Sequence, residues 1–492
     1  MLFNTFGFLF VFLPLTVGGF FLIGRLGSRF GILWLCAASL LFFADWNHRY
    51  LWLLVSSVVG NYVFGSLILR TSSRNKSVLL GIAIFLNLGV LAYYKYAGFL
   101  CGNLNAVFSC GLTFGQIILP LGISFFTFTQ IAYLTDCRQG KVTESDFADY
   151  LLFVTYFPHL IAGPILHHSG MIPQFRSPEV TRVEWNNCAT GLVILSIGLA
   201  KKVLLADNLS GWATPVFDNA HLGNVPLMAE AWAAVIAYSL QLYFDFSGYC
   251  DMAVGISLFF NIRLPVNFNS PYKSTSIIEF WRRWHITLST FLRDYLYIPL
   301  GGNRKGSLRR YLNIFVTMLV GGLWHGAGWT FIIWGALHGV YLMVNHGFMK
   351  FFRLEASPRL KPIVLLFSVA LTYFCVLVGW VFFRSQDLST AFRMLSGMAG
   401  MNPVTWKSHA HLELYWFVYA CLLMVWFFPN AQEITRYTEY GKAKPDSVNR
   451  CLISIRWNPV AWTGWVIPGL LLGIAVLAML NGKPSEFLYF QF

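Results

Sequence analysis

The stretch of residues 311–349 contains no Asp, Glu, Lys or Arg. A helix needs about 20 apolar residues to cross a bilayer, so this stretch is too long for a single span. Two glycine-rich sites, 321–322 and 326–328, interrupt it. The pattern predicts two helices that are joined at membrane depth by a break around Trp324-His325. Irregular backbone is confined at that depth to places that protein or a water-filled cavity surrounds.

The rest of the chain has the same apolar character. Charged residues make up 11% of the sequence and hydrophobic residues 57%, whereas a soluble domain carries roughly 25% charged residues. This composition excludes a disordered chain, a cytosolic enzyme and a periplasmic domain on one anchor. Further apolar runs lie at 6–24, 30–44, 50–69, 77–94, 112–134, 150–166, 188–200, 226–244, 252–262, 362–383, 412–428 and 463–480. We predict an all-α polytopic membrane protein with about 11 to 13 transmembrane or re-entrant helices, forming a single domain over residues 1–492.

The net charge of +14 would suggest nucleic acid as a partner if the protein were soluble. Here the basic residues lie in short loops between apolar runs, as the positive-inside rule and anionic headgroups require. We therefore expect membrane lipids as partners and no nucleic acid. If the loops 25–29 and 70–76 are cytoplasmic, then 45–49 and the N-terminus lie outside. The nine Cys form no C-x-x-C pair, and we predict neither a disulfide framework nor a metal site.

Ionisable groups in apolar surroundings are costly, so they usually face a cavity or a partner. His325 lies between two glycine-rich sites and two tryptophans, Trp324 and Trp329. A neutral imidazole there is suited to removing a proton from an acceptor hydroxyl. The alternative is a structural histidine that binds a carbonyl freed by the glycine break. The residues themselves leave both interpretations open.

A second candidate is the segment 280–295, which combines tryptophans, arginines and His285. At helical spacing Trp281, His285, Leu288 and Leu292 share one face. An amphipathic helix at the membrane interface explains most of the segment. It explains His285 poorly, because that residue lies on the apolar face. Arg282 and Arg283 have the chemistry to bind an anionic donor such as a coenzyme phosphate.

Two further segments are weaker candidates. Asp245 and Asp251 end an apolar run and are interpreted as helix caps at a membrane surface, or as partners of His or Arg in a polar cavity. The segment 156–164 contains His159 between two prolines and either lines a pathway or bends a helix. The adjacent His167 and His168 make a poor metal pair. The other histidines are expected to be structural or solvated: His48, His221, His338, His346, His409 and His411.

Several of these segments together resemble one family. The motifs are Phe280-Trp281-Arg282-Arg283-Trp284-His285, the stretch 292–304 and Leu323-Trp324-His325-Gly326, supported by 120–125, 157–164, 243–251 and 487–492. They resemble the membrane-bound O-acyltransferases, and most of all the bacterial branch that acetylates alginate. The resemblance implies helices in a ring around a central funnel. It also implies that His325 is the essential histidine and His285 the second family histidine. The family often has Lys where this chain has His159.

The resemblance also implies a function. An acetyl group would come from a cytoplasmic thioester, with acetyl-CoA as the donor and no tightly bound cofactor. It would pass through the membrane protein to a periplasmic acetyltransferase partner and then to an exported polysaccharide such as alginate. Arg282, Arg283 and Trp324 would bind the donor, and the protein would lie in the bacterial inner membrane. The alternatives are a transporter or flippase for polysaccharide or acyl groups, and an inactive scaffold of an export complex.

Overall fold

The structure is a computed structural model that describes residues 1–112, 115, 117–144, 146–351, 357, 359–402, 412–440, 457–458, 463–482, 485 and 487–488. All regular secondary structure in this part of the chain is helical, which confirms the predicted all-α class. The helices before residue 222 are α1 (Leu13–Gly24), α2 (Ser28–Asn47), α3 (Leu51–Arg70), α4 (Ser73–Leu91), α5 (Ala97–Phe108), α6 (Ile123–Arg138), α7 (Phe147–Thr155), α8 (Phe157–Leu160), α9 (His168–Phe175), α10 (Trp185–Ala200) and α11 (Asp207–His221).

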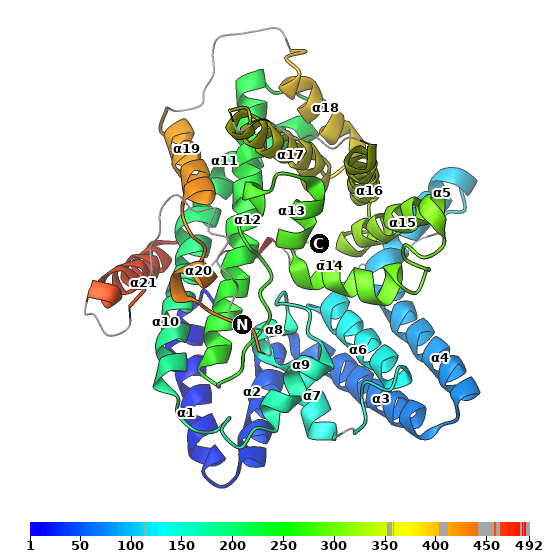
Figure 1. Ribbon diagram of the computed structural model, residues 1–492, viewed down its shortest axis with the longest axis vertical. Helices are drawn as coiled ribbons and strands as arrows, with labels where there is room; N and C mark the ends of the chain where they lie inside the picture. Colours follow the sequence, from blue (N-terminus) through cyan, green and yellow to red (C-terminus); the bar gives the residue numbers. More distant parts are fainter. Residues whose placement is uncertain are drawn as a thin grey trace.

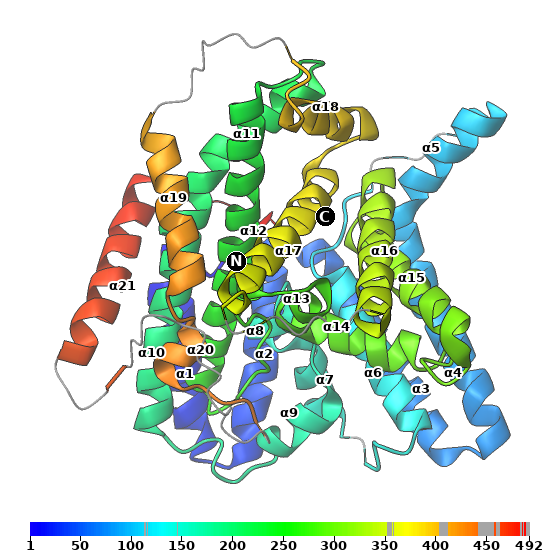
Figure 2. The same cartoon turned by 45° about the horizontal axis from the view of Figure 1, so that its top comes forward.

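The remaining α-helices are α12 (Met228–Leu258), α13 (Ile277–Arg283), α14 (Ile286–Leu292), α15 (Gly306–His325), α16 (Trp329–Phe351), α17 (Lys361–Arg384), α18 (Leu388–Met398), α19 (Leu412–Phe427), α20 (Ala431–Thr435) and α21 (Thr463–Asn481). Short π-helical turns are η1 (Gly7–Phe12), η3 (Ala92–Tyr96), η4 (Lys201–Ala206) and η6 (Arg293–Tyr297), and 3₁₀ turns are η2 (His48–Tyr50) and η5 (Pro271–Lys273). Helices from both halves of the chain surround the short helices α8, α13 and α14 (Figure 1). Helix α5 projects away from the others (Figure 2).

Five helical segments among the described residues are long and apolar enough to cross a membrane: Gly7–Gly24, Ser28–Arg70, Arg74–Phe108, Trp185–His221 and Lys361–Arg384. The chain is therefore a membrane protein, as its composition predicts. The Met1 ammonium lies 2.9 Å from the Asp45 carboxylate, so the N-terminus and the segment 45–49 lie close together, which is compatible with the predicted topology. The higher number of spans and the central funnel stay predictions.

The charge-free stretch 311–349 forms two helices, as predicted. Helix α15 ends at His325, and α16 begins at Trp329. The two helices pack closely because Gly322 faces Gly335, and a Cβ atom at either position would collide with the backbone of the other helix. The glycines therefore serve both the break and the contact between the two helices.

The expectation of one continuous helix over 280–295 is wrong. The chain leaves helical geometry between α13 and α14, where His285 has a left-handed φ of +43°. The neighbouring segment around Asn267 binds the backbone at this point: the Ile286 N–H donates to the Asn267 carbonyl oxygen at 3.0 Å, and the Thr287 N–H donates to Asn267 Oδ1 at 3.2 Å. These tertiary hydrogen bonds replace those that a continuous helix would make, so Trp281 and His285 do not share a helix face.

The interpretation of Asp245 and Asp251 as caps is also wrong. Both lie inside α12 and are buried. Their ionic partners are lysines of η4 and not His or Arg: Lys202 Nζ lies 2.7 Å from Asp245 Oδ1, and Lys201 Nζ lies 2.7 Å from Asp251 Oδ2. The second oxygen of Asp245 accepts the Leu488 N–H at 3.0 Å. Buried charges of this kind have to be paired, and these pairs join α12 to η4.

We expect Asp245→Ala to lower the free energy of unfolding by about 3 kcal/mol, because it leaves the buried Lys202 with less compensation. Unfolding in mixed detergent micelles measures the change. Glu179→Ala is the control, since it removes the partner of Arg182 in a pair whose side chains are 65% and 74% exposed; it should cost less than about 1 kcal/mol. Equal stabilities of the two variants would contradict the prediction.

Candidate active site

His325 lies at the last position of α15 and is 4% exposed. Aromatic rings enclose its imidazole. The ring centroids of Trp324, Trp334 and Phe383 lie 4.9, 5.0 and 5.2 Å from that of His325. The glycine break after His325 lets the chain turn from α15 into α16, so that Trp334 of the second helix faces the last residue of the first. This enclosure keeps bulk water away from the imidazole.

His285 is fully buried, and its ring centroid lies 6.4 Å from that of His325. The structure thus brings the two predicted histidines together, although forty residues separate them in the sequence. The edge of the Phe246 ring packs on His285 with centroids 4.8 Å apart. The left-handed backbone at His285 turns its side chain toward Asn267. This conformation is energetically unfavourable for a residue other than glycine, so the surrounding contacts have to hold it.

Asn267 determines the orientation of His285. Its Oδ1 accepts hydrogen bonds from the Thr287 N–H and the Thr287 hydroxyl at 3.2 and 2.9 Å, so this atom is an acceptor. His285 Nδ1 lies 3.1 Å from the same oxygen and must carry the proton. In the neutral imidazole the lone pair then belongs to Nε2. In the sequence, Asn267 lies between Pro265 and Pro271, a pattern that predicts a turn and gives no sign of a contact with His285.

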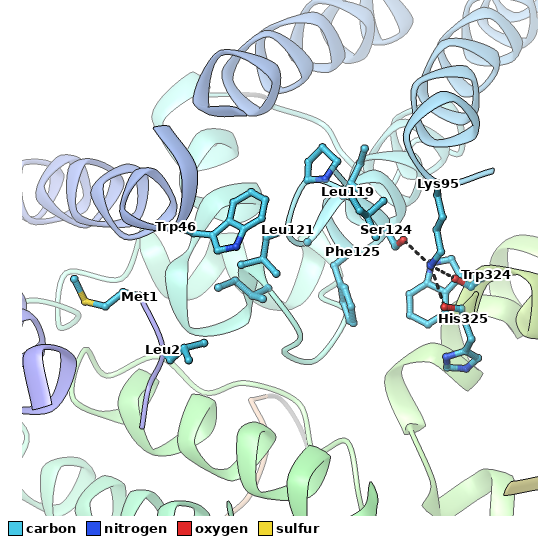
Figure 3. A pocket seen from close by; sticks show the side chains of 14 residues that line it. Met1, Leu2, Trp46, Lys95, Leu119, Leu121, Ser124, Phe125, Trp324 and His325 are labelled. Atoms are coloured by element: carbon cyan, nitrogen blue, oxygen red, sulfur yellow. Dashed lines mark hydrogen bonds between the residues drawn. The ribbon is translucent and has the colours of Figure 1, made fainter. Parts of the chain in front are cut away.

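A cavity of about 310 Å³ extends from the N-terminal residues to His325 (Figure 3). Its walls include Met1, Trp46, Lys95, Trp324 and the segment 119–125. The segment 119–125 leads into α6 through Gly122, the residue just before the helix. Gly122 has a φ of +72°, and a Cβ there would collide with the Leu160 carbonyl oxygen. The family-like motif 120–125 therefore forms a wall of the cavity.

Two polar residues of this region escape the sequence-based prediction. Lys95 lines the cavity, and it is the one charged residue between 77 and 108, which is the signal that could have found it. His338 is fully buried and not solvated. The Trp281 indole donates to His338 Nδ1 at 3.3 Å, and Trp334 packs on the ring at 4.9 Å. His338 follows Trp334 by four residues on α16, so the two side chains lie on the same face of that helix.

The predicted donor-binding residues fall into three different surroundings. Arg282 is exposed, whereas the guanidinium of Arg310, in the basic cluster 304–310, lies 2.8 Å from the His346 ring. Arg283 pairs with Glu279 at 3.1 Å and donates to the Asn269 carbonyl oxygen at 3.1 Å. Trp324 lines the cavity, and its indole N–H has no hydrogen-bond partner among the described residues.

The histidines of the segment 156–168 have structural contacts. His159 is buried in α8, and its Nε2 lies 3.0 Å from the Phe153 carbonyl oxygen. His167 Nδ1 lies 3.2 Å from the Tyr295 hydroxyl, which donates to Asp136 at 3.0 Å. His168 packs against Tyr133 and Phe153. This segment bends the chain beside the cavity and brings no second imidazole to His325.

Known proteins are similar to this chain, two of them over its whole length. The chain is 41% identical to a peptidoglycan O-acetyltransferase of Helicobacter pylori, with 100% of this chain and 98% of that protein covered. It is 38% identical to the "Probable alginate O-acetylase AlgI" of Azotobacter vinelandii, with 100% of both covered. A teichoic acid D-alanyltransferase of Streptococcus thermophilus is 27% identical over 47% of this chain and 57% of its own length. The model of the membrane-bound O-acyltransferase family matches residues 17–383. The chain belongs to this family and is a membrane O-acyltransferase.

Proposed function

We propose that this enzyme transfers an acetyl group from a cytoplasmic thioester, acetyl-CoA, across the bacterial inner membrane to a hydroxyl group of an exported glycan. The observation that carries the proposal is the pair of buried imidazoles of His285 and His325, whose ring centroids lie 6.4 Å apart, together with the cavity that His325 lines. A hydroxyl group that enters the cavity meets a neutral imidazole that is shielded from bulk water, and general-base catalysis needs this arrangement.

The proposed step moves one acetyl group to the acceptor oxygen and one proton to the leaving thiolate. His325 takes the proton of the acceptor hydroxyl while the hydroxyl oxygen attacks the thioester carbonyl carbon. The carbon–sulfur bond then breaks, and the leaving thiolate receives the proton from the imidazolium. His285, which Asn267 holds with its lone pair on Nε2, positions the acceptor hydroxyl beside His325. The Trp324 indole N–H, which has no partner among the described residues, is available to the carbonyl oxygen on which negative charge develops.

The donor would approach His325 from the side where α15 begins. Helix α15 begins beside the basic residues 304–310 and ends at His325. Arg310 therefore lies about 22 Å along the helix axis from His325. Coenzyme A separates its phosphates from its thioester by an extended arm, so Arg282 and Arg310 are suited to the phosphates while the thioester reaches the histidines. Arg283, which is engaged by Glu279 and Asn269, would contribute charge to the same region.

The acceptor end follows from the cavity. Its lining includes Met1 and Trp46. Trp46 belongs to the segment 45–49, which lies outside if the loops 25–29 and 70–76 are cytoplasmic. The two full-length relatives are named for alginate and for peptidoglycan, and both polymers present sugar hydroxyl groups outside the membrane. We infer that a periplasmic acetyltransferase partner receives the acetyl group at this site and passes it to a glycan of this kind, which is the final acceptor. A transporter without acyl chemistry would depend on an ion gradient and would not consume acetyl-CoA.

Radiolabelled acetyl-CoA and the purified enzyme in proteoliposomes test the function. We expect His325→Ala to reduce acetyl transfer at least about 100-fold, because it removes the general base. His48→Ala, which changes an exposed histidine outside the cavity, should retain the wild-type rate. Full activity of His325→Ala would reject the role of His325. No transfer by the wild-type enzyme in the presence of the periplasmic partner and a glycan acceptor would reject acetyl-CoA as the donor.

Asn267→Ala should reduce kcat by about 10- to 100-fold, because His285 then loses the acceptor that orients it. Steady-state kinetics on the folded fraction measure the change. Asn61→Ala is the matched control: it removes a buried amide that pairs with Asn87 between α3 and α4. The control should lower stability and leave kcat unchanged, and a comparable fall in kcat for both variants would count against the proposed role of Asn267.

Arg282→Gln should raise the KM for acetyl-CoA about tenfold at an unchanged kcat, which corresponds to the loss of one charge-assisted contact. Arg74→Gln, at the exposed start of α4, should leave the KM unchanged. Comparing acetyl-CoA with acetyl-pantetheine, which lacks the phosphates at the far end, shows whether the effect follows the phosphates. An equal effect of Arg282→Gln on both donors would exclude a phosphate contact.

A further inference from the structure

The end of α15 receives its hydrogen bonds from a different helix. The chain turns away at Gly326, so the last carbonyl groups of α15 have no donor within the helix. Three consecutive carbonyl oxygens are bound from one neighbouring turn. The Tyr96 hydroxyl donates to the Leu323 oxygen at 2.8 Å. The Lys95 ammonium donates to the oxygens of Trp324 and His325 at 2.6 and 3.1 Å.

Lys95 uses all of its donors in this contact. Besides the two carbonyl oxygens, its Nζ lies 3.4 Å from the Ser124 hydroxyl, and an ammonium has three N–H groups. Figure 3 shows the side chain reaching from its own helix to the end of α15. Its Nζ also lies 5.9 Å from the centre of the Trp324 ring. The positive charge stands at the negative end of the α15 dipole, where a cation is stabilised.

The local structure of the first helix aims Lys95 at this target. Lys95 and Tyr96 lie in the π-helical turn η3, within the apolar segment Arg74–Phe108. Single π-helical turns change the register of a helix and are frequent at functional sites. The turn lets two consecutive side chains reach the same helix end. A lone cation in an apolar segment needs a compensating partner, and the carbonyl groups of α15 provide it.

We propose that Lys95 is a positioning residue, which holds Trp324 and His325 in the geometry that acyl transfer requires. The proposal rests on the proposed function of His325. Helix ends fray unless they are capped, and the glycines after His325 give no support from the following chain. Lys95 therefore fixes the backbone that carries both the histidine and the tryptophan. Its N–H groups are already engaged, so it acts through this backbone and does not bind the substrate.

The test compares Lys95→Met with the wild-type enzyme. Met has a similar length but no donor. We expect kcat to fall about 100-fold, the size of effect that a displacement of about 1 Å produces, while the KM for acetyl-CoA changes less than about threefold. Hydrogen exchange of the α15 backbone near His325 should become faster. Hydrogen exchange reports whether Lys95 stabilises the end of α15, even if the enzyme has no acetyl-transfer activity.

Lys273→Met is the matched control. Lys273 is 8% exposed, and its ammonium donates at 2.7 Å to the carbonyl oxygen of Phe428, just after the end of α19. The control makes the same chemical change at another helix end. We expect it to leave kcat per folded molecule and exchange at the end of α15 unchanged. An equal fall in kcat for both lysine variants would attribute the effect to general destabilisation and overturn the proposal.

The remaining outcomes are also decisive. If the wild-type enzyme transfers acetyl and His325→Ala does not, the function stands; wild-type kcat and exchange in Lys95→Met then overturn the role of Lys95 alone. If Lys95→Met does not fold, Lys95→Gln replaces it. That variant keeps two N–H donors but no charge, and we expect kcat to fall about tenfold with faster exchange. Wild-type values for Lys95→Gln would overturn the proposal.

Discussion

A peptide group inside a bilayer has no water to bind, so each break in a membrane helix has to be satisfied by protein. This constraint governs the active site. The chain breaks helical geometry after His325 and again at His285. Each break receives its hydrogen bonds from a distant segment: Lys95 and Tyr96 at the first, and Asn267 at the second. The same contacts that make the breaks possible also fix the two histidines.

The enclosure of the histidines follows from the same need. Trp324, Trp334 and Phe383 come from three helices and meet around His325. Their rings exclude water, and the indole N–H groups of Trp324 and Trp334 have no hydrogen-bond partner among the described residues. The aromatic content of the chain, 17%, is therefore part of the chemistry as well as of the packing.

Buried charge plays a different part elsewhere in the fold. Lys201 and Lys202 are adjacent residues of η4, and each pairs with a carboxylate of α12. The pairs join the helices at a level where α10 and α12 are already close, since Gly198 and Gly248 face each other. Asp245 also binds the backbone of Leu488, so the end of the described chain is tied to the centre of α12, next to the ring of Phe246 that packs on His285.

Sequence patterns predict several helices correctly, and the wrong predictions share one cause. Periodicity finds α15 and α16 because the apolar pattern and the glycines act locally. It fails at 280–295, where a helical pattern is overridden by hydrogen bonds to Asn267, and at Asp245, whose lysine partner is more than forty residues away. Lys95 is visible as a lone cation in an apolar run, but its target is not. Periodicity reports only on neighbours along the chain.

The membrane class and the helical architecture follow from composition and spacing, because solvation by lipid and local chain geometry depend on residue type. The expectation that His325 is the essential histidine and His285 the second one comes from the family resemblance and stays a prediction. Three features depend on packing: the approach of the two imidazoles, the tautomer that Asn267 imposes on His285, and the capping of α15 by Lys95. Each is a contact between segments that are distant in sequence. Only the folded chain brings their atoms within hydrogen-bonding distance.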